Sequence, residues 1–167
     1  MELVEGTATV DDVDEFVATL ADIAADHGVT VQAFDARYVV SRRHLERAVE
    51  LADRERARGE AIARDRAVEI LLYAAGRRQI TRALELGVDE GETPVVVLVD
   101  DDGDGDGDER AASEAVTDLL APAETLGAYD EERVREFFEV GDAELAATDA
   151  TLEDLVLERV ALLVVER

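Results

Sequence analysis

The sequence predicts an α/β protein in which a small mixed β-sheet is flanked by several helices. Three observations lead to this prediction. Apolar residues recur at helical spacing in several segments, and many of these segments end at a glycine. Short β-branched segments lie between them, the most apolar being 93–99 (TPVVVLV). The length of 167 residues, 47% of them hydrophobic, suits one core, so a single domain is predicted over 1–167.

The first third of the chain predicts a strand, a helix and a second strand. Residues 1–9 (MELVEGTAT) alternate loosely and favour a short strand. Asp12 and Glu15 form a capping-box-like start, apolar residues then follow at helical spacing, and Gly28 ends the helix. Residues 29–34 (VTVQAF) predict the second strand.

Three helices are predicted in the middle of the chain. Ser41 is the expected N-cap of a helix that stops at Gly59, and Asp65 is the expected cap of a helix that ends at Gly76. A third, short helix closes at Gly87. His44, in the first of these helices, is expected to be solvated or in contact with a phosphate.

The last third predicts a buried strand, an acidic loop and four helices. The strand at 93–99 is expected to be buried on both faces, and the loop covers 100–109 (DDDGDGDGDE). Helices are expected near 111–120, 130–138 and 142–147. From Thr151 onward apolar residues surround the helix on nearly all sides, which indicates one face in the core and another against a partner.

The charge of the chain is strongly acidic and unevenly distributed. It holds 42 Asp and Glu against 17 basic residues, all of them Arg, for a net charge of −25. This balance favours adaptation to molar salt, the alternative being an acidic protein that repels nucleic acid. Residues 37–82 nevertheless hold 12 of the 17 Arg and only seven acids, a local net charge of +5. A basic island in an otherwise acidic chain predicts anion binding.

Several classes of function find no support in the sequence. Cysteine is absent, so disulfides, thiolate metal sites and thiol catalysis are excluded. No serine nucleophile motif, phosphate-binding loop or dinucleotide fingerprint is present, and no cofactor or metal is expected. No apolar segment approaches 18 residues and the start carries no leader pattern, so a cytoplasmic protein without a membrane contact is expected.

Two groups of arginines within the island are the candidate anion ligands. Arg77 and Arg78 follow Gly76, with Arg82 one turn further on, whereas Arg64 and Arg66 begin the preceding helix. An antiparallel helix pair would separate the two groups and crossing helices would bring them together, and the sequence does not decide between these arrangements. Gln79 adds a side chain able to read a base edge. Three further arginines have acidic neighbours that predict a salt-bridged face: Arg54, Arg56 and Arg58.

The central motif resembles that of a known family. Residues 69–80 (EILLYAAGRRQI), with 33–40 (AFDARYVV) and 44–48 (HLERA), are similar to the small kinase-binding subunit of the KEOPS complex, the family that includes the PRPK-binding protein. The ending 157–164 (LERVALLV) also fits. Two features depart from the family pattern: Arg77 stands where Thr or Ser is common, and the acidic loop looks like an insertion.

The resemblance implies a non-catalytic role in tRNA modification. KEOPS installs a threonylcarbamoyl group on the adenosine beside the anticodon, and this subunit binds a small atypical kinase or ATPase and captures the 3′ CCA end of tRNA. Carried over by the motif, Arg78, Gln79 and Ile80 are expected to contact tRNA. The neighbouring arginines are expected to assist them, and the apolar side chains of the last helix are expected to bind the kinase. The assisting arginines are Arg64, Arg66, Arg77 and Arg82, and the kinase candidates are Leu155 and Val156.

Two other functions stay open at this level. A pure protein-interaction subunit would pair the arginine island with an acidic surface of the kinase and would not bind tRNA by itself. An enzyme acting on nucleotides or phosphate esters would use the same arginines as anion clamps, but the sequence offers no base, nucleophile or metal site for it.

Overall fold

The computed structural model describes residues 1–101 and 105–165, which fall into two compact units. Unit 1 comprises Met1–Ala36 and Gly87–Leu126, and unit 2 comprises Arg37–Leu86 and Gly127–Arg167. Unit 1 contains a β-sheet with two helices, and unit 2 is helical, so the predicted α/β class is confirmed. The organisation as a single domain stays a prediction.

The sheet of unit 1 has the strand order β2-β3-β1-β4, and every pairing in the described residues is antiparallel. The prediction of a mixed sheet is therefore wrong in this detail. The reason is topological, because β3 inserts between β1 and β2 and runs antiparallel to both. β4 is a two-residue edge strand that the sequence did not reveal. The strands are β1 (Glu2–Val10), β2 (Val29–Asp35), β3 (Gly91–Asp101) and β4 (Ala121–Pro122).

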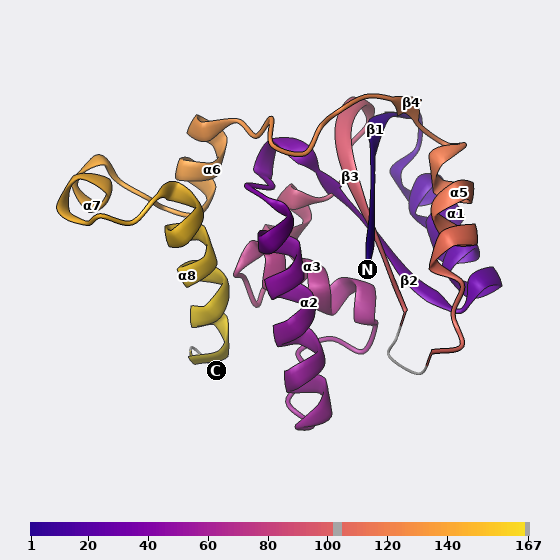
Figure 1. The fold of residues 1–167 in the computed structure, drawn as a ribbon, viewed down its shortest axis with the longest axis horizontal. Helices are drawn as coiled ribbons and strands as arrows, with labels where there is room; N and C mark the ends of the chain where they lie inside the picture. Colours follow the sequence, from indigo (N-terminus) through magenta and orange to yellow (C-terminus); the bar gives the residue numbers. More distant parts are fainter. Residues whose placement is uncertain (102–104, 166–167) are drawn as a thin grey trace. The chain divides into compact units, whose positions relative to one another are not determined.

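Helices α1 (Val13–His27) and α5 (Glu109–Thr117) pack together on one face of this sheet (Figure 1). Asp12 caps α1 by accepting the amide of Glu15 at 3.1 Å, and Gly28 ends it with a left-handed φ of 65°, as predicted. Alternate residues of β3 supply the core beneath the two helices. The intervening residues of β3, which face the other side of the sheet, are equally buried. This confirms that β3 is buried on both faces.

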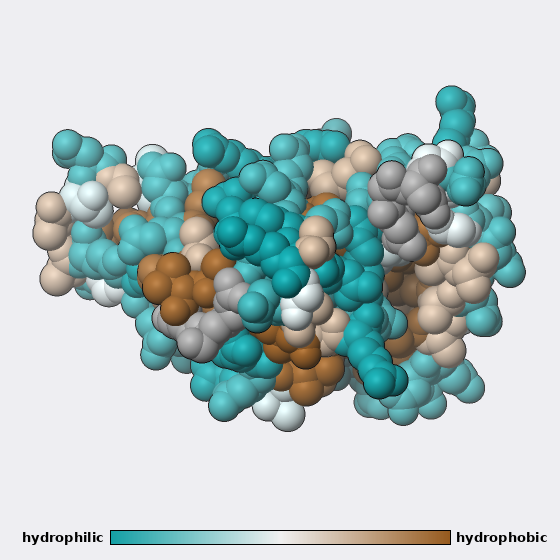
Figure 2. Space-filling view, turned by 90° about the horizontal axis from the view of Figure 1, so that it is seen from below, coloured by the Kyte–Doolittle hydropathy of each residue, from teal (hydrophilic) through white to brown (hydrophobic). Residues whose placement is uncertain are grey.

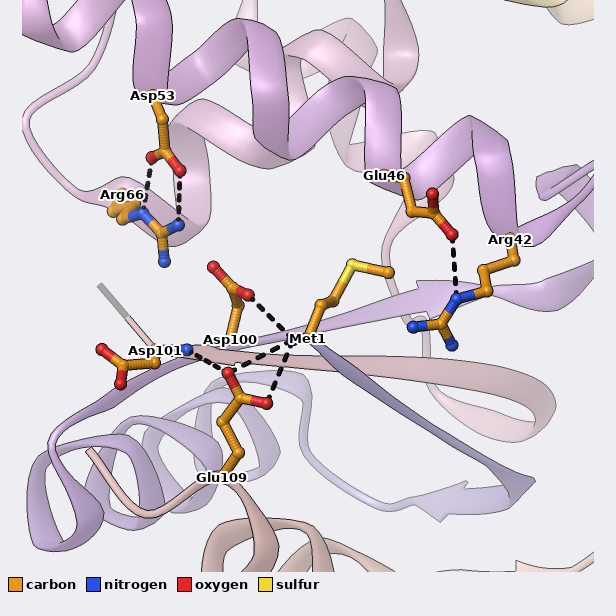
Figure 3. Close-up of polar contacts among 8 residues, drawn as sticks. All are labelled: Met1, Arg42, Glu46, Asp53, Arg66, Asp100, Asp101 and Glu109. Atoms are coloured by element: carbon orange, nitrogen blue, oxygen red, sulfur yellow. Dashed lines mark hydrogen bonds and ion pairs between the residues drawn. The ribbon is translucent and has the colours of Figure 1, made fainter. Parts of the chain in front are cut away.

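The predicted acidic loop at 100–109 is shorter in the structure at both ends. Asp100 and Asp101 extend β3, Glu109 begins α5, and residues 102–104 lie outside the described part of the chain. Asp100 and Glu109 together bind the N-terminal ammonium group. The α-ammonium of Met1 lies 3.3 Å from Asp100 Oδ1 and 3.1 Å from Glu109 Oε1 (Figure 3). Burial opposes the charge, but these carboxylates raise the pKa of the ammonium above its ordinary value.

Unit 2 is built around α3 (Arg66–Ala75), which packs against α2 (Arg42–Ala57) and α8 (Leu152–Val165). Seven consecutive residues of α3, from Glu69 to Ala75, are buried. The caps predicted at Ser41 and Asp65 are both present. The remaining elements of unit 2 are η1 (Ala36–Tyr38, which begins at the unit boundary), α4 (Ile80–Ala83), η2 (Leu84–Leu86), α6 (Glu131–Phe137) and α7 (Asp142–Ala147).

Candidate functional site

The two units differ sharply in charge. Sixteen of the 17 arginines belong to unit 2, which also holds 20 acidic residues and has a net charge of −4. Unit 1 holds Arg110 alone against 22 acidic residues, a net charge of −21. The basic island of the sequence therefore folds into unit 2, and the candidate anion ligands are to be sought on its surface.

The segment after α3 forms a tight corner between two helices. Gly76 adopts a φ of 62°, and the Arg77 amide donates to the Leu72 carbonyl at 3.1 Å, which together close α3. A side chain at Gly76 would place its Cβ 3.0 Å from the carbonyl oxygen of Arg159 on α8. Gln79 is the N-cap of α4, but its side chain makes no capping bond. The corner is thus held by the backbone and leaves the Gln79 amide available for a ligand.

Four predicted contact residues are exposed on this corner: Arg78, Gln79, Ile80 and Arg82. Arg78 and Arg82 are exposed, and neither forms an ion pair with any residue in the described ranges. Ile80 is 46% exposed, and Leu84 one turn later is 54% exposed. Two cations, an amide and an apolar pair therefore share a surface of about two helical turns. Such a surface can bind a phosphate and stack against a base at the same time.

Arg77 is committed to the protein itself. Its guanidinium donates to the Phe137 carbonyl, and its Cζ lies 4.9 Å from the centroid of the Phe137 ring. Glu139 Oε2 lies 3.9 Å from Nη1 on the same side chain. The cation thereby closes the carbonyl end of α6, where the helix dipole favours positive charge. Arg77 is placed to hold the corner in position, while Arg78 next to it points to solvent.

Arg64 and Arg66 lie at the opposite end of α3 from the corner. A helix of 10 residues separates the two groups by about 15 Å, so the structure does not bring all the predicted ligands together. The Arg66 side chain is only 10% exposed and forms a bidentate pair with Asp53, with both N···O distances at 2.8 Å (Figure 3). Arg64 is exposed and forms no ion pair within the described residues.

His44 lies beneath the corner, not at the surface. It is fully buried; its Nε2 lies 2.8 Å from the Ala74 carbonyl oxygen, and its Nδ1 accepts the Val40 amide at 3.4 Å. One ring nitrogen therefore donates and the other accepts, which defines a neutral imidazole. Burial lowers the pKa of His44 to about 4. The expectation that His44 is solvated or contacts a phosphate is wrong, because its ring packs edge-on against Phe138 inside unit 2.

The predicted kinase-binding residues are part of the core of unit 2. Leu155 and Val156 are 4% and 0% exposed, so their side chains cannot reach a partner's surface in this structure. The exposed apolar residues of α8 are instead Leu162 (37%) and Val165 (76%). Figure 2 shows hydrophobic residues at the surface near the end of this helix. Apolar residues on nearly all sides of the predicted helix indicated an exposed apolar face, but the sequence did not show which residues form that face.

Neither a metal-ligand cluster nor a membrane-spanning helix is found in the described parts of the chain. Among residues 1–101 and 105–165, no three His, Cys, Asp or Glu side chains come together as metal ligands. Within the same ranges, no helix combines the length and the apolar character needed to cross a bilayer.

Comparison with known families places the protein in a kinase-binding class. Residues 9–163 match the model of the family described as kinase binding protein CGI-121. Since this match covers most of the chain, the protein belongs to the CGI-121 family, and the resemblance drawn from the motif at 69–80 is confirmed. A search of curated proteins found no match.

Proposed function

We propose that the protein is a non-catalytic subunit of the KEOPS complex that binds the kinase or ATPase subunit and captures tRNA through its 3′ CCA end. It would act in the cytoplasm of a salt-adapted cell. The kinase partner follows from the family, and the tRNA role is the extension made here. The observation that carries the extension is the exposed corner of Arg78, Gln79, Ile80 and Arg82, whose two cations have no acid paired with them in the described residues.

The composition of this corner suits RNA binding in concentrated salt. At 1 M salt the screening length is about 3 Å, so long-range attraction between a cation and a phosphate is weak. Affinity then depends on short-range contacts, for which the planar arginine fork suits phosphate and base faces better than lysine does. A single-stranded CCA end exposes bases that can stack on the guanidinium planes or pack against Ile80.

The kinase-binding surface is proposed at the C-terminal part of α8. Leu162 and Val165 are exposed apolar side chains on a helix whose other apolar residues are buried or partly buried. Docking of a kinase there would remove this apolar area from water without rearranging the core. Leu162 and Val165 thus replace Leu155 and Val156 as the candidate kinase-binding residues. Substitution of Leu155 or Val156 would instead disrupt the core of unit 2.

The deciding experiment measures binding of whole tRNA, and of the same tRNA without its CCA end, in molar potassium chloride. Binding of the intact tRNA alone supports CCA capture. Charge reversal at Arg78 and Arg82 is expected to abolish this binding. Arg43→Glu is the matched control, because Arg43 is an exposed arginine of the same unit, on α2, that forms no ion pair in the described residues.

Absence of tRNA binding, with tight binding to the kinase, would instead favour the pure protein-interaction subunit. In that case the exposed arginines would pair with an acidic surface of the kinase. Charge reversal at Arg78 and Arg82 would then weaken the kinase complex, whereas the tRNA-capture proposal expects that complex to survive.

A further inference from the structure

The connection between α2 and α3, at the lower end of α2 in Figure 1, has a fixed backbone at its start. Gly59 takes a left-handed φ of 74°, and the Glu60 amide donates to the Glu55 carbonyl at 2.8 Å. These two features are those of a Schellman helix end. At its other end, Asp65 caps α3 by accepting the amides of Ala67 and Val68.

Between these ends, a buried carboxylate holds the backbone of the connection. Glu69 on α3 is fully buried, and its side chain points back at the two residues before Arg64. Oε1 accepts the amides of Ile62 and Ala63, both at 3.1 Å, and Oε2 also accepts the Ile62 amide, at 3.0 Å. A charged acceptor on backbone amides is among the stronger hydrogen bonds in proteins.

A guanidinium holds the same backbone through its carbonyls. Arg56, in the last turn of α2, donates through Nη1 to the carbonyl oxygen of Arg64 at 3.1 Å and to that of Ala63 at 3.4 Å. The carboxylate of Glu69 thus binds the backbone amides of the connection, and the guanidinium of Arg56 binds its backbone carbonyls. Arg64 is the residue that this arrangement fixes, although its own side chain is exposed and forms no ion pair in the described residues.

We infer that Glu69 and Arg56 are positioning residues that hold Arg64 as a contact for a backbone phosphate of RNA, an inference that rests on the proposed function. Holding the main chain in advance removes part of the ordering entropy that a mobile loop would lose on binding. Arginine offers the bidentate geometry that a phosphate accepts. The contact would lie about 15 Å from the corner at Arg78, one length of α3 away. Arg64 would therefore bind the same RNA at a second position.

Glu69→Gln is the sharpest perturbation of this arrangement. The amide keeps the size of the side chain, but one of its ends is now an NH₂ group. Because both carboxylate oxygens accept from backbone amides, either orientation of the Gln amide sets a donor against a donor. The variant is therefore expected to loosen the connection, and hydrogen exchange at the Ile62 and Ala63 amides should accelerate.

A double-mutant cycle tests whether Glu69 acts through Arg64. Arg64→Ala is expected to weaken tRNA binding about tenfold and to reduce the slope of log affinity against log salt by about 0.7 to 0.9, as for one lost phosphate contact. Glu69→Gln is expected to weaken binding by about threefold or more in the parent chain. It should have no further effect when residue 64 is already Ala. Kinase affinity should stay unchanged throughout.

Val116→Ala controls for general destabilisation, since Val116 is a fully buried core residue of unit 1, whereas the connection belongs to unit 2. It should bind tRNA like the parent chain. Three results would overturn the inference: unchanged affinity in Glu69→Gln, an equal effect of Glu69→Gln with and without Arg64, or loss of kinase affinity in place of tRNA affinity. If Arg64→Ala has no effect while Arg78→Ala weakens binding, the inference fails and the proposed function stands.

Discussion

Acidification is expected to destabilise unit 2 through His44, the buried imidazole that joins α2 to the last turn of α3. Burial lowers its pKa from 6.5 to about 4, and the hydrogen bond to Ala74 offsets only part of that effect. The pKa of His44 is lower in the folded state than in the unfolded state, so the neutral imidazole contributes stability that is complete above pH 6.5. This contribution is lost as the pH falls toward 4. One unit of pKa corresponds to about 1.4 kcal/mol, so the loss is about 2 kcal/mol by pH 5 and about 3 kcal/mol at full protonation.

The assay compares the parent chain with His44→Gln by urea unfolding in molar potassium chloride between pH 8 and pH 5. The Gln side chain can still donate to the Ala74 carbonyl but does not titrate. The 42 acidic residues titrate in both chains, so their effect cancels in the difference between the two free energies of unfolding. The parent's advantage at pH 8 should shrink by about 2 kcal/mol at pH 5. A constant difference across this range would refute the neutral, buried imidazole.

Three further substitutions test the architecture of unit 2. Gly76→Ala should destabilise the protein by about 2 kcal/mol in urea unfolding, because it adds a Cβ at positive φ, 3.0 Å from the Arg159 carbonyl oxygen. Arg77→Ala should cost about 2 kcal/mol of stability yet weaken tRNA binding less than Arg78→Ala in the same titration. Leu162→Glu should weaken kinase binding about tenfold in calorimetry without loss of stability, since its side chain is already partly exposed.

Each of these substitutions has a result that contradicts its premise. Unfolding of Gly76→Ala at the parent's urea concentration would mean that α8 does not lie close to the end of α3. If Arg77→Ala is as stable as the parent and loses tRNA binding like Arg78→Ala, both arginines contact RNA. If Leu162→Glu binds the kinase normally while a surface substitution elsewhere on unit 2 does not, the kinase-binding surface is not on α8.

Local signals made most of the fold predictable. Helix starts at Asp12, Ser41 and Asp65 depend on a side-chain oxygen that accepts a nearby amide, and helix ends at Gly28 and Gly76 depend on positive φ. Such interactions join residues that are four or fewer positions apart, so the local sequence is enough to predict them. The sheet order was not predictable in this way, because the insertion of β3 between β1 and β2 joins segments far apart in the chain.

The candidate site was predictable as a segment but not residue by residue. The motif at 69–80 located the corner, yet Arg77 and Arg78 are neighbours with opposite roles, one closing α6 and the other facing solvent. Arg66 looked like a ligand and is paired with Asp53, which is 13 residues earlier. Leu155 and Val156 looked open to a partner and are buried. In each case a tertiary contact decides the role, and residue type alone does not carry that information.

The unequal charge of the two units makes dissolved salt a component of the fold. In dilute buffer, near 0.01 M, the screening length grows to about 30 Å, and the net charge of −21 in unit 1 repels itself across the whole unit. Unit 2, at −4, has little such repulsion to screen. Desalting is therefore expected to melt the sheet before the helices around α3. Loss of β-sheet signal ahead of helical signal during dialysis would identify counterions as the missing partners of unit 1.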